Sequence, residues 1–101
     1  MILEVAAIQV QPGKEAEFEA AIATAYTLLK DTEGYCSHTL RRCIEAGDRY
    51  LLQIQWETLE AHTVNFRESE RFTTWRSIIG PFFAAPPDVM HYEVVHDSPH
   101  Q

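Results

Sequence analysis

The sequence predicts an α+β fold in which four strands and two helices follow the order β-α-β-β-α-β. Three observations lead to this prediction. Short segments rich in Ile, Val and aromatic residues end at turn residues, Ala- and Glu-rich segments carry apolar residues at helical spacing, and the two kinds occur in that order. The 101 residues allow one domain, which we place at residues 2–96, followed by a frayed tail at residues 97–101.

The first strand and the first helix have the clearest patterns. Residues 2–11 are rich in Ile and Val and end at Pro12-Gly13, as expected of a strand closed by a turn. The helix that follows, within residues 14–32, is rich in Ala, Glu and Leu. Its apolar stripe consists of Phe18, Ala21, Ile22, Ala25 and Leu29.

The rest of the chain alternates in the same way. Thr58 is a plausible N-cap, and Gly80-Pro81 ends the last helix. The expected elements are a strand at 35–45, a hairpin turn at 46–48, a strand at 49–57, helices at 59–68 and 70–79, and a strand at 88–96.

Right-handed crossovers convert this order into a ferredoxin-like sandwich, an antiparallel sheet with both helices on one face. The other face would meet water, although Leu51 contributes to it together with Cys36 or Ser37 and with Val89 or Met90. A half-apolar open face favours packing against a second copy. We therefore expect a homodimer that forms a dimeric α/β barrel.

The charge and the apolar pattern exclude several partners. Eight basic residues against fifteen acidic ones give a formal net charge of −7, which disfavours nucleic acid and anionic membrane surfaces. No apolar run approaches the roughly 20 residues of a membrane span. Cys36 and Cys43 would lie about 23 Å apart along one strand, beyond the ~7 Å limit for a disulfide. We expect free thiols and a cytoplasmic location.

Cofactor and metal motifs are absent from the sequence. It contains no G-x-G-x-x-G, Walker, G-x-S-x-G or H-E-x-x-H motif, and no Cys or His pair with zinc-site spacing. We therefore expect neither a cofactor nor a metal. Any redox chemistry would be done by the substrate with dioxygen, or by a borrowed cofactor.

The segment from residue 51 to residue 87 carries a family resemblance. A strand ends in Trp56-Glu57, and the residues that follow include the pairs Ala61-His62 and Asn65-Phe66, then Ser69 and Phe72. With Val10, Pro12-Gly13 and Gly34, this pattern resembles the antibiotic biosynthesis monooxygenase family over nearly the whole chain. The resemblance implies the dimeric α/β barrel and an oxygenase activity.

Within that family, the small cofactor-free oxygenases of aromatic polyketide pathways use a Trp, an Asn, a Tyr and an Arg. The resemblance puts Trp56 at the Trp position, Arg76 at the Arg position and His62 at the Tyr position. Leu52 stands in place of the Asn. In the haem-degrading branch, Ala6 and Arg76 occupy approximately the places of the Asn and of the axial His, so that branch fits less well.

Each candidate catalytic residue has a structural alternative. Trp56 is either a core residue or the group that orients a substrate ring. His62 is either a satisfied core histidine or the general base, since its ordinary pKa is near 6.5. Arg76 is either solvated at the surface, or in a salt bridge to Glu68 or Glu70, or turned inward to stabilise an anion.

A flat aromatic ligand would need an apolar pocket with few polar groups. The candidates for its walls are Leu52, Phe66, Phe72 and Phe83, and His38 and His91 could face the same cleft from strands that are not adjacent.

Three functions follow. The first is a cofactor-independent monooxygenase that deprotonates an electron-rich phenol, anthrone or quinol, whose anion then reduces dioxygen. The second is a non-catalytic module of the same fold that binds a small aromatic molecule or haem, which Leu52 at the Asn position favours. The third is a small isomerase or another proton-transfer enzyme.

Overall fold

The computed structural model describes residues 1–99, and the remaining part of the expected tail, residues 100–101, lies outside the described residues. The elements are β1 (Ile2–Gln9), α1 (Glu15–Lys30), β2 (Tyr35–Arg42), β3 (Arg49–Trp56), η1 (Ala61–Phe66), α2 (Glu70–Ile79), η2 (Gly80–Phe82) and β4 (Asp88–Tyr92). The expected β-α-β-β-α-β order and the α+β class are confirmed.

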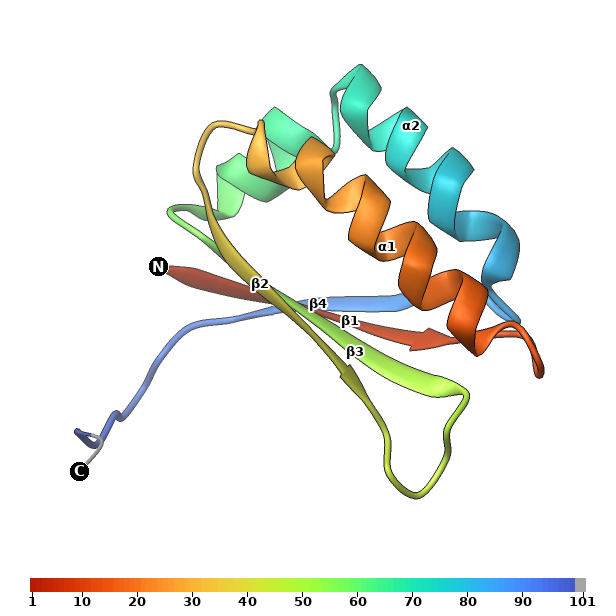
Figure 1. The fold of residues 1–101 in the computed structure, drawn as a ribbon. Helices are drawn as coiled ribbons and strands as arrows, with labels where there is room; N and C mark the ends of the chain where they lie inside the picture. Colours follow the sequence, from red (N-terminus) through yellow and green to blue (C-terminus); the bar gives the residue numbers. More distant parts are fainter. Residues whose placement is uncertain (100–101) are drawn as a thin grey trace.

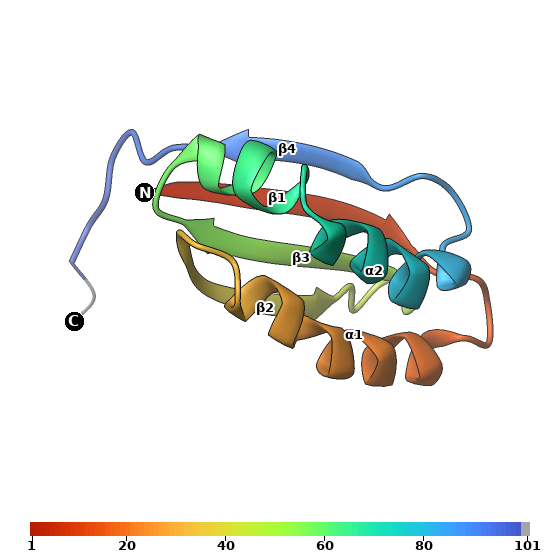
Figure 2. The ribbon, with the colours of Figure 1, turned by 90° about the horizontal axis from the view of Figure 1, so that it is seen from above.

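The four strands form one antiparallel sheet in the order β2-β3-β1-β4. Both helices lie on the same face of this sheet (Figure 1). Seen from above, α1 runs along the β2 side, and η1 lies closer to β1 and β4 (Figure 2). This is the ferredoxin-like arrangement that the sequence predicts.

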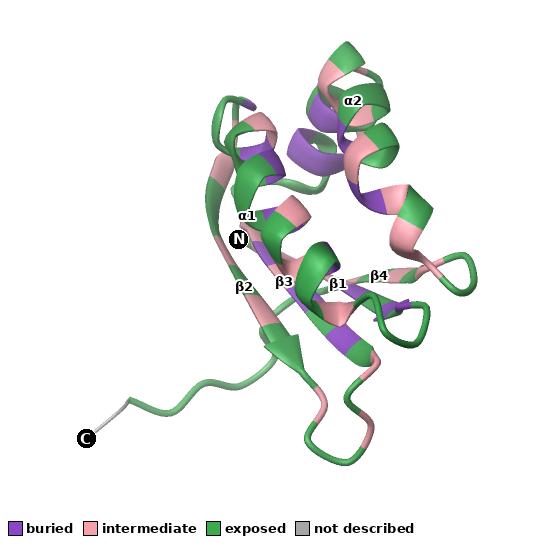
Figure 3. Ribbon diagram, turned by 45° about the vertical axis from the view of Figure 1, so that its right-hand side comes forward, coloured by how far each residue is buried: buried purple, intermediate pink, exposed green. Residues whose placement is uncertain are grey.

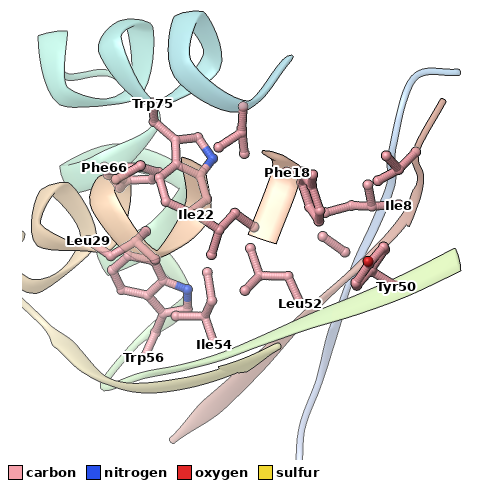
Figure 4. Packing of buried hydrophobic residues seen from close by; sticks show 14 of the residues in the cluster. Ile8, Phe18, Ile22, Leu29, Tyr50, Leu52, Ile54, Trp56, Phe66 and Trp75 are labelled. Carbon is pink, nitrogen blue, oxygen red and sulfur yellow. The ribbon is translucent and has the colours of Figure 1, made fainter. Parts of the chain in front are cut away.

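The core lies between the helices and the sheet. The buried residues of α1 are Phe18, Ile22, Ala25 and Leu29, which is the predicted stripe without the half-buried Ala21. They pack over the inward side chains of the sheet, among them Leu52 and Ile54 of β3 (Figure 4). Two aromatic groups close the ends of this layer, one around Phe18 and one around Trp56.

The outer face of the sheet has no helix over it (Figure 3). Leu51 of β3 and Met90 and Tyr92 of β4 are 41%, 53% and 51% exposed. Of the two pairs of alternatives in the sequence, Met90 lies on this face beside Val5, and Ser37 lies on it beside Gln55.

Three strands end at least two residues earlier than the sequence predicts, and β3 ends one residue earlier, at Trp56. β4 ends at Tyr92 rather than at residue 96, because its last partner is Leu3, the second residue of β1. β2 ends at Arg42, where the chain opens into a wider loop that closes with a bond from Cys43 N–H to the Arg49 carbonyl, 2.8 Å. β1 ends at Gln9, after which Val10 forms a single bridge with Phe83.

The helix expected at residues 59–68 is confirmed in part: residues 59–66 are helical, but most of them form a widened turn, η1. Thr58 caps it as predicted, its Oγ1 accepting a hydrogen bond from Ala61 N–H at 3.1 Å. Within η1 the backbone is π-helical, and Arg67 N–H donates to the carbonyl of His62, five residues back, at 2.9 Å. Such widened turns are frequent at functional sites.

Gly34 fixes the position of η1 against the sheet. Its φ of +94° is unfavourable for any residue with a side chain, and a Cβ at this position would lie 2.5 Å from the Cβ of Ala61. The carbonyl of Glu33, the preceding residue, accepts a bond from Asn65 Nδ2 at 3.0 Å. This close approach holds the turn that carries His62.

Cys36 and Cys43 are free thiols. No helix within residues 1–99 combines the length and the apolar character that crossing a membrane requires.

Candidate active site

Glu4 is a carboxylic acid on the inward face of β1, where its neighbours along the strand are Ala6 and Ile8. It is 6% exposed. In the sheet register, Glu4 lies between Ile54 of β3 and His91 of β4. The alternation of β1 therefore directs an ionisable group into the core.

Four side chains join around this carboxyl group, and we call Glu4, Trp56, His62 and His91 the Glu4 cluster. Trp56 Nε1–H donates to Glu4 Oε1 at 3.0 Å. His62 Nε2 lies 3.3 Å from the same oxygen. On the other side of the imidazole, His62 Nδ1 lies 2.7 Å from His91 Nε2.

The pKa shifts in the Glu4 cluster are all dominated by burial. Burial raises the pKa of Glu4, and the Trp56 hydrogen bond and the charge of Arg67 partly oppose this. Burial, with Arg67 and His91 adding to it, lowers the pKa of His62 to about 3. Burial and then Arg67 lower the pKa of His91 as well. His62 is therefore neutral near pH 7, and its contact with Glu4 is a hydrogen bond rather than an ion pair.

Trp56 is completely buried and supports the cluster from behind. Its ring stacks on His62 with centroids 5.4 Å apart and an angle of 20° between planes. Tyr35 and Phe66 pack against its other sides. The indole is therefore enclosed by protein and does not line the cavity, which favours the core alternative for Trp56 over the one in which it orients a substrate ring.

A cavity of about 870 Å³ lies between the sheet and α2, extending under the loop that leads to β4. Its volume falls within the usual range for small-molecule sites, roughly 300–1,000 Å³. Glu4 and His62 form part of its wall together with Arg67. The aromatic residues that line it are Phe66, Phe72, Trp75 and Phe83.

Among the residues predicted from the sequence, Leu52, His62, Phe66, Phe72, Phe83 and Arg76 line this cavity. Leu52 is 2% exposed and keeps the sheet side of the cavity apolar. The Arg76 guanidinium carbon lies 5.8 Å from the centre of the Phe72 ring. The ion pairs of residues 1–99 do not include Arg76, so the predicted salt bridge to Glu68 or Glu70 is not formed.

The two strand histidines are separated. β2 and β4 are opposite edges of the sheet, so His38 and His91 do not share a cleft. His38 Nδ1 lies 2.7 Å from the Tyr35 hydroxyl, and its ring packs 5.5 Å from that of Tyr26. His91 instead belongs to the Glu4 cluster, because β4 pairs with β1.

Sequence reasoning missed Glu4 and Arg67. Glu4 was visible only as the residue that interrupts the apolar start of the chain. The signal that identifies it is its spacing: Glu4 falls on the same face of the strand as the apolar Ala6 and Ile8. Charged residues are rarely buried without a partner, so a carboxylate on such a face is unusual. Arg67 carried no comparable signal, since its position depends on the widened turn η1.

Within residues 1–99, no group of three or more His, Cys, Asp or Glu side chains is arranged to hold a metal ion. Glu4, His62 and His91 hydrogen-bond to one another instead.

Comparison with known proteins places this site in a family context. The family model described as antibiotic biosynthesis monooxygenase matches residues 1–77. An uncharacterized Bacillus subtilis protein, YczJ, is 37% identical over 95 residues, which are 94% of this chain and 100% of YczJ.

Solved structures show the same fold. A Bordetella bronchiseptica protein that is assigned to the antibiotic biosynthesis monooxygenases is 46% identical, with a TM-score of 0.91 over 94% of this chain and 97% of its own. SnoaB of Streptomyces nogalater, a cofactor-independent oxygenase, is 18% identical, with a TM-score of 0.85 over 98% of this chain and 97% of its own. At that identity the second likeness concerns the fold alone.

Proposed function

Because the chain belongs to the antibiotic biosynthesis monooxygenase family, we propose that it is a cofactor-independent monooxygenase. Its substrate is an electron-rich aromatic molecule, a phenol, anthrone or quinol, and its oxidant is dioxygen. One observation carries this proposal. The wall of the aromatic-lined cavity of about 870 Å³ contains a buried acid–base pair, Glu4 and His62, whose side chains contact each other.

The chemistry needs little beyond this arrangement. Removing a proton from such a substrate gives a delocalised anion that can itself reduce dioxygen. The His62–Glu4 pair accepts the proton, and the positive charges of Arg67 and Arg76 at the cavity wall stabilise the anion. Phe66 and Phe72 provide flat apolar surfaces for the rings. Trp56 acts by holding Glu4 and His62, which it contacts directly.

A second candidate function is a non-catalytic module that binds an aromatic molecule or haem. Leu52 favours it, because an apolar side chain on the sheet side of the cavity offers no hydrogen bond to an oxygenated intermediate. The two functions share the cavity and differ only in turnover.

We also propose that two copies pack through the outer face of the sheet. Leu51, Met90 and Tyr92 form an exposed apolar group on that face, and monomeric proteins rarely expose such groups over a large area. Size-exclusion chromatography with light scattering tests this at micromolar concentration, and a mass of 11.6 kDa, that of one chain, contradicts it.

Oxygen consumption with dithranol or a reduced naphthoquinone tests the catalytic proposal. The wild type should consume oxygen above the background rate. His62→Ala breaks the acid–base pair with Glu4 and should lower the rate by roughly 10²-fold or more, the scale of one acid–base contribution. His96→Ala, at an exposed position outside the cavity, is the control.

The oxygen assay also decides between the candidate functions. If the wild type binds the ligand without consuming oxygen, the binding module is correct.

The absorption spectrum tests whether the protein carries a cofactor. We expect a purified protein with no Soret band and no flavin absorption, and a stoichiometric chromophore would contradict the cofactor-independent mechanism.

A further inference from the structure

The two oxygens of the Glu4 carboxyl group have different surroundings. Oε1 faces both Trp56 Nε1 and His62 Nε2, at 3.0 and 3.3 Å. No hydrogen bond within residues 1–99 involves Oε2. Every fully buried side-chain nitrogen or oxygen among them has a partner, so Oε2 is not fully buried. Glu4 lines the cavity, and Oε2 is its oxygen without a protein partner, so we infer that Oε2 is the oxygen available to a ligand.

His62, in contrast, has no free nitrogen. Nε2 contacts Glu4, and Nδ1 lies 2.7 Å from His91 Nε2. A neutral imidazole has one N–H donor and one bare acceptor nitrogen. An ionised Glu4 can only accept, so Nε2 of His62 carries the proton and Nδ1 accepts from the N–H of His91. The lone pair that a base requires is already in use.

We propose, on the basis of the monooxygenase function above, that Glu4 is the catalytic base and that its Oε2 takes the proton from the substrate. His62 and His91 are then positioning residues. His62 holds Oε1 so that Oε2 points into the cavity, and His91 fixes the tautomer of His62 that donates to Glu4.

The proton transfer balances without a further reactant. An O–H or C–H bond of the substrate breaks, its electron pair stays on the aromatic system, and the proton forms an O–H bond with Oε2. The substrate anion transfers one electron to dioxygen, and the two resulting radicals join through a C–O bond to give a peroxide anion, which takes the proton back from Glu4. For an anthrone methylene group, Glu4 then removes the second C–H proton, and the C=O bond forms as the O–O bond breaks. The departing hydroxide takes this proton from Glu4, so that CH₂ and O₂ become C=O and H₂O.

The surroundings of Glu4 suit this role. Burial raises its pKa, and a base works best when its pKa lies close to the working pH. The hydrogen bond from Trp56 and the charge of Arg67 both oppose this rise and favour the carboxylate. Arg67, which also lines the cavity, carries the opposite charge to the substrate anion that forms as Glu4 becomes neutral.

Two glutamine variants separate the roles of Glu4 and His62. Glu4→Gln keeps an oxygen that accepts from Trp56 and His62 but cannot take a proton, so kcat should fall by roughly 10²- to 10⁴-fold with little change in KM. His62→Gln keeps an amide that donates to Glu4 and accepts from His91, and it should retain activity to within roughly 10-fold, well below the 10²-fold scale of a lost base.

Glu60→Gln makes the same chemical change at an exposed carboxylate outside the cavity and is the matched control. Circular dichroism verifies that each variant is folded. Equal activity of Glu4→Gln and wild type, or a loss in His62→Gln as large as that in Glu4→Gln, overturns the assignment.

Work under argon tests the base independently of oxygenation. Without dioxygen the reaction stops after proton transfer, and bound dithranol should accumulate as its coloured anion in the wild type but not in Glu4→Gln. Anion formation without oxygen consumption in air would refute the monooxygenase function and leave Glu4 as the base. Oxygen consumption that is unaffected by Glu4→Gln would support the monooxygenase function and refute Glu4 as the base.

His91→Phe tests the positioning role. Nitrogen NMR of the wild type should show His62 with its proton on Nε2, and removing the His91 donor should produce a mixture of the two tautomers. A His62 tautomer that is unchanged in His91→Phe contradicts this role.

Discussion

Lowering the pH should destabilise the folded protein mainly through His62. This imidazole is 2% exposed, and burial lowers its pKa to about 3 from its ordinary value of 6.5. Below pH 6.5 the unfolded chain binds a proton at this position while the folded protein does not. The stability contributed by the neutral His62 is therefore complete above pH 6.5 and is lost as the pH falls toward 3.

The size of the effect follows from the shift. Each pKa unit corresponds to about 1.4 kcal/mol, so a shift from 6.5 to about 3 corresponds to about 5 kcal/mol in total. Roughly half of this stability is lost by pH 4.8. The loss is a large fraction of the free energy of unfolding of a typical domain, about 5–15 kcal/mol. Glu4 acts in the opposite direction, because its raised pKa makes the folded state lose stability as the pH rises.

Urea unfolding followed by circular dichroism at pH 7, 6 and 5, at one protein concentration, measures this linkage. His62→Gln should remove the His62 contribution, so its free energy of unfolding should depend on pH less steeply than that of the wild type, by about 1 kcal/mol per pH unit. His96→Gln should behave like the wild type. Equal slopes for His62→Gln and the wild type would refute the argument.

Four further changes have defined outcomes. Glu4→Gln removes a buried charge. At a pH above the raised pKa of Glu4, it should raise the urea concentration at the unfolding midpoint while activity is lost, and a lower midpoint contradicts this. Gly34→Ala combines a positive φ with a clash against Ala61 and should destabilise by about 1–3 kcal/mol or more in the same assay. Trp56→Phe removes the donor to Glu4 and leaves a void, so it should cost about 1–3 kcal/mol and lower turnover while the circular dichroism spectrum is kept. Leu52→Asn adds a polar group to the cavity wall and should keep or raise the rate of oxygen consumption, so a complete loss with an intact fold counts against the proposed substrate orientation.

The fold was predictable because each element has its own local signal. In β3 the residues Tyr50, Leu52, Ile54 and Trp56 alternate with more polar ones, and all four are buried. Such periodicity depends on the pattern of one segment and not on its partners. The lengths of β1, β2 and β4 depend on where a neighbouring strand ends, and these were overestimated.

The widened turn η1 was not predictable in the same way. The stretch from Ala61 to Phe66 has ordinary helical composition, and the choice between bonds to the fourth and to the fifth preceding carbonyl is made by packing. The contact of Ala61 with Gly34 and the bond from Asn65 to Glu33 belong to that packing. Both join segments far apart in the chain.

The part of the site that depends on neighbouring segments was predicted, and the part that depends on distant segments was not. Trp56 and His62 are close in sequence, and the strand–turn–helix connection brings them together. The rest of the cluster depends on the sheet register, since Glu4 lies opposite His91 only because β1 pairs with β4. Strand pairing of this kind is not readable from one sequence, and the base that the structure assigns was therefore missed.

The Glu4 cluster is explained better by chemistry than by folding. A buried carboxylate is costly even when it accepts hydrogen bonds, and its neighbours Ala6 and Ile8 show that this face of β1 is otherwise a hydrophobic layer. The donors of Trp56 and His62 do need an acceptor, but a glutamine would satisfy both without an ionisable group. What only the acid provides is a group that can accept a proton, which is the role that we propose for Oε2. A local conflict between sequence and fold of this kind is expected where a residue serves a reaction.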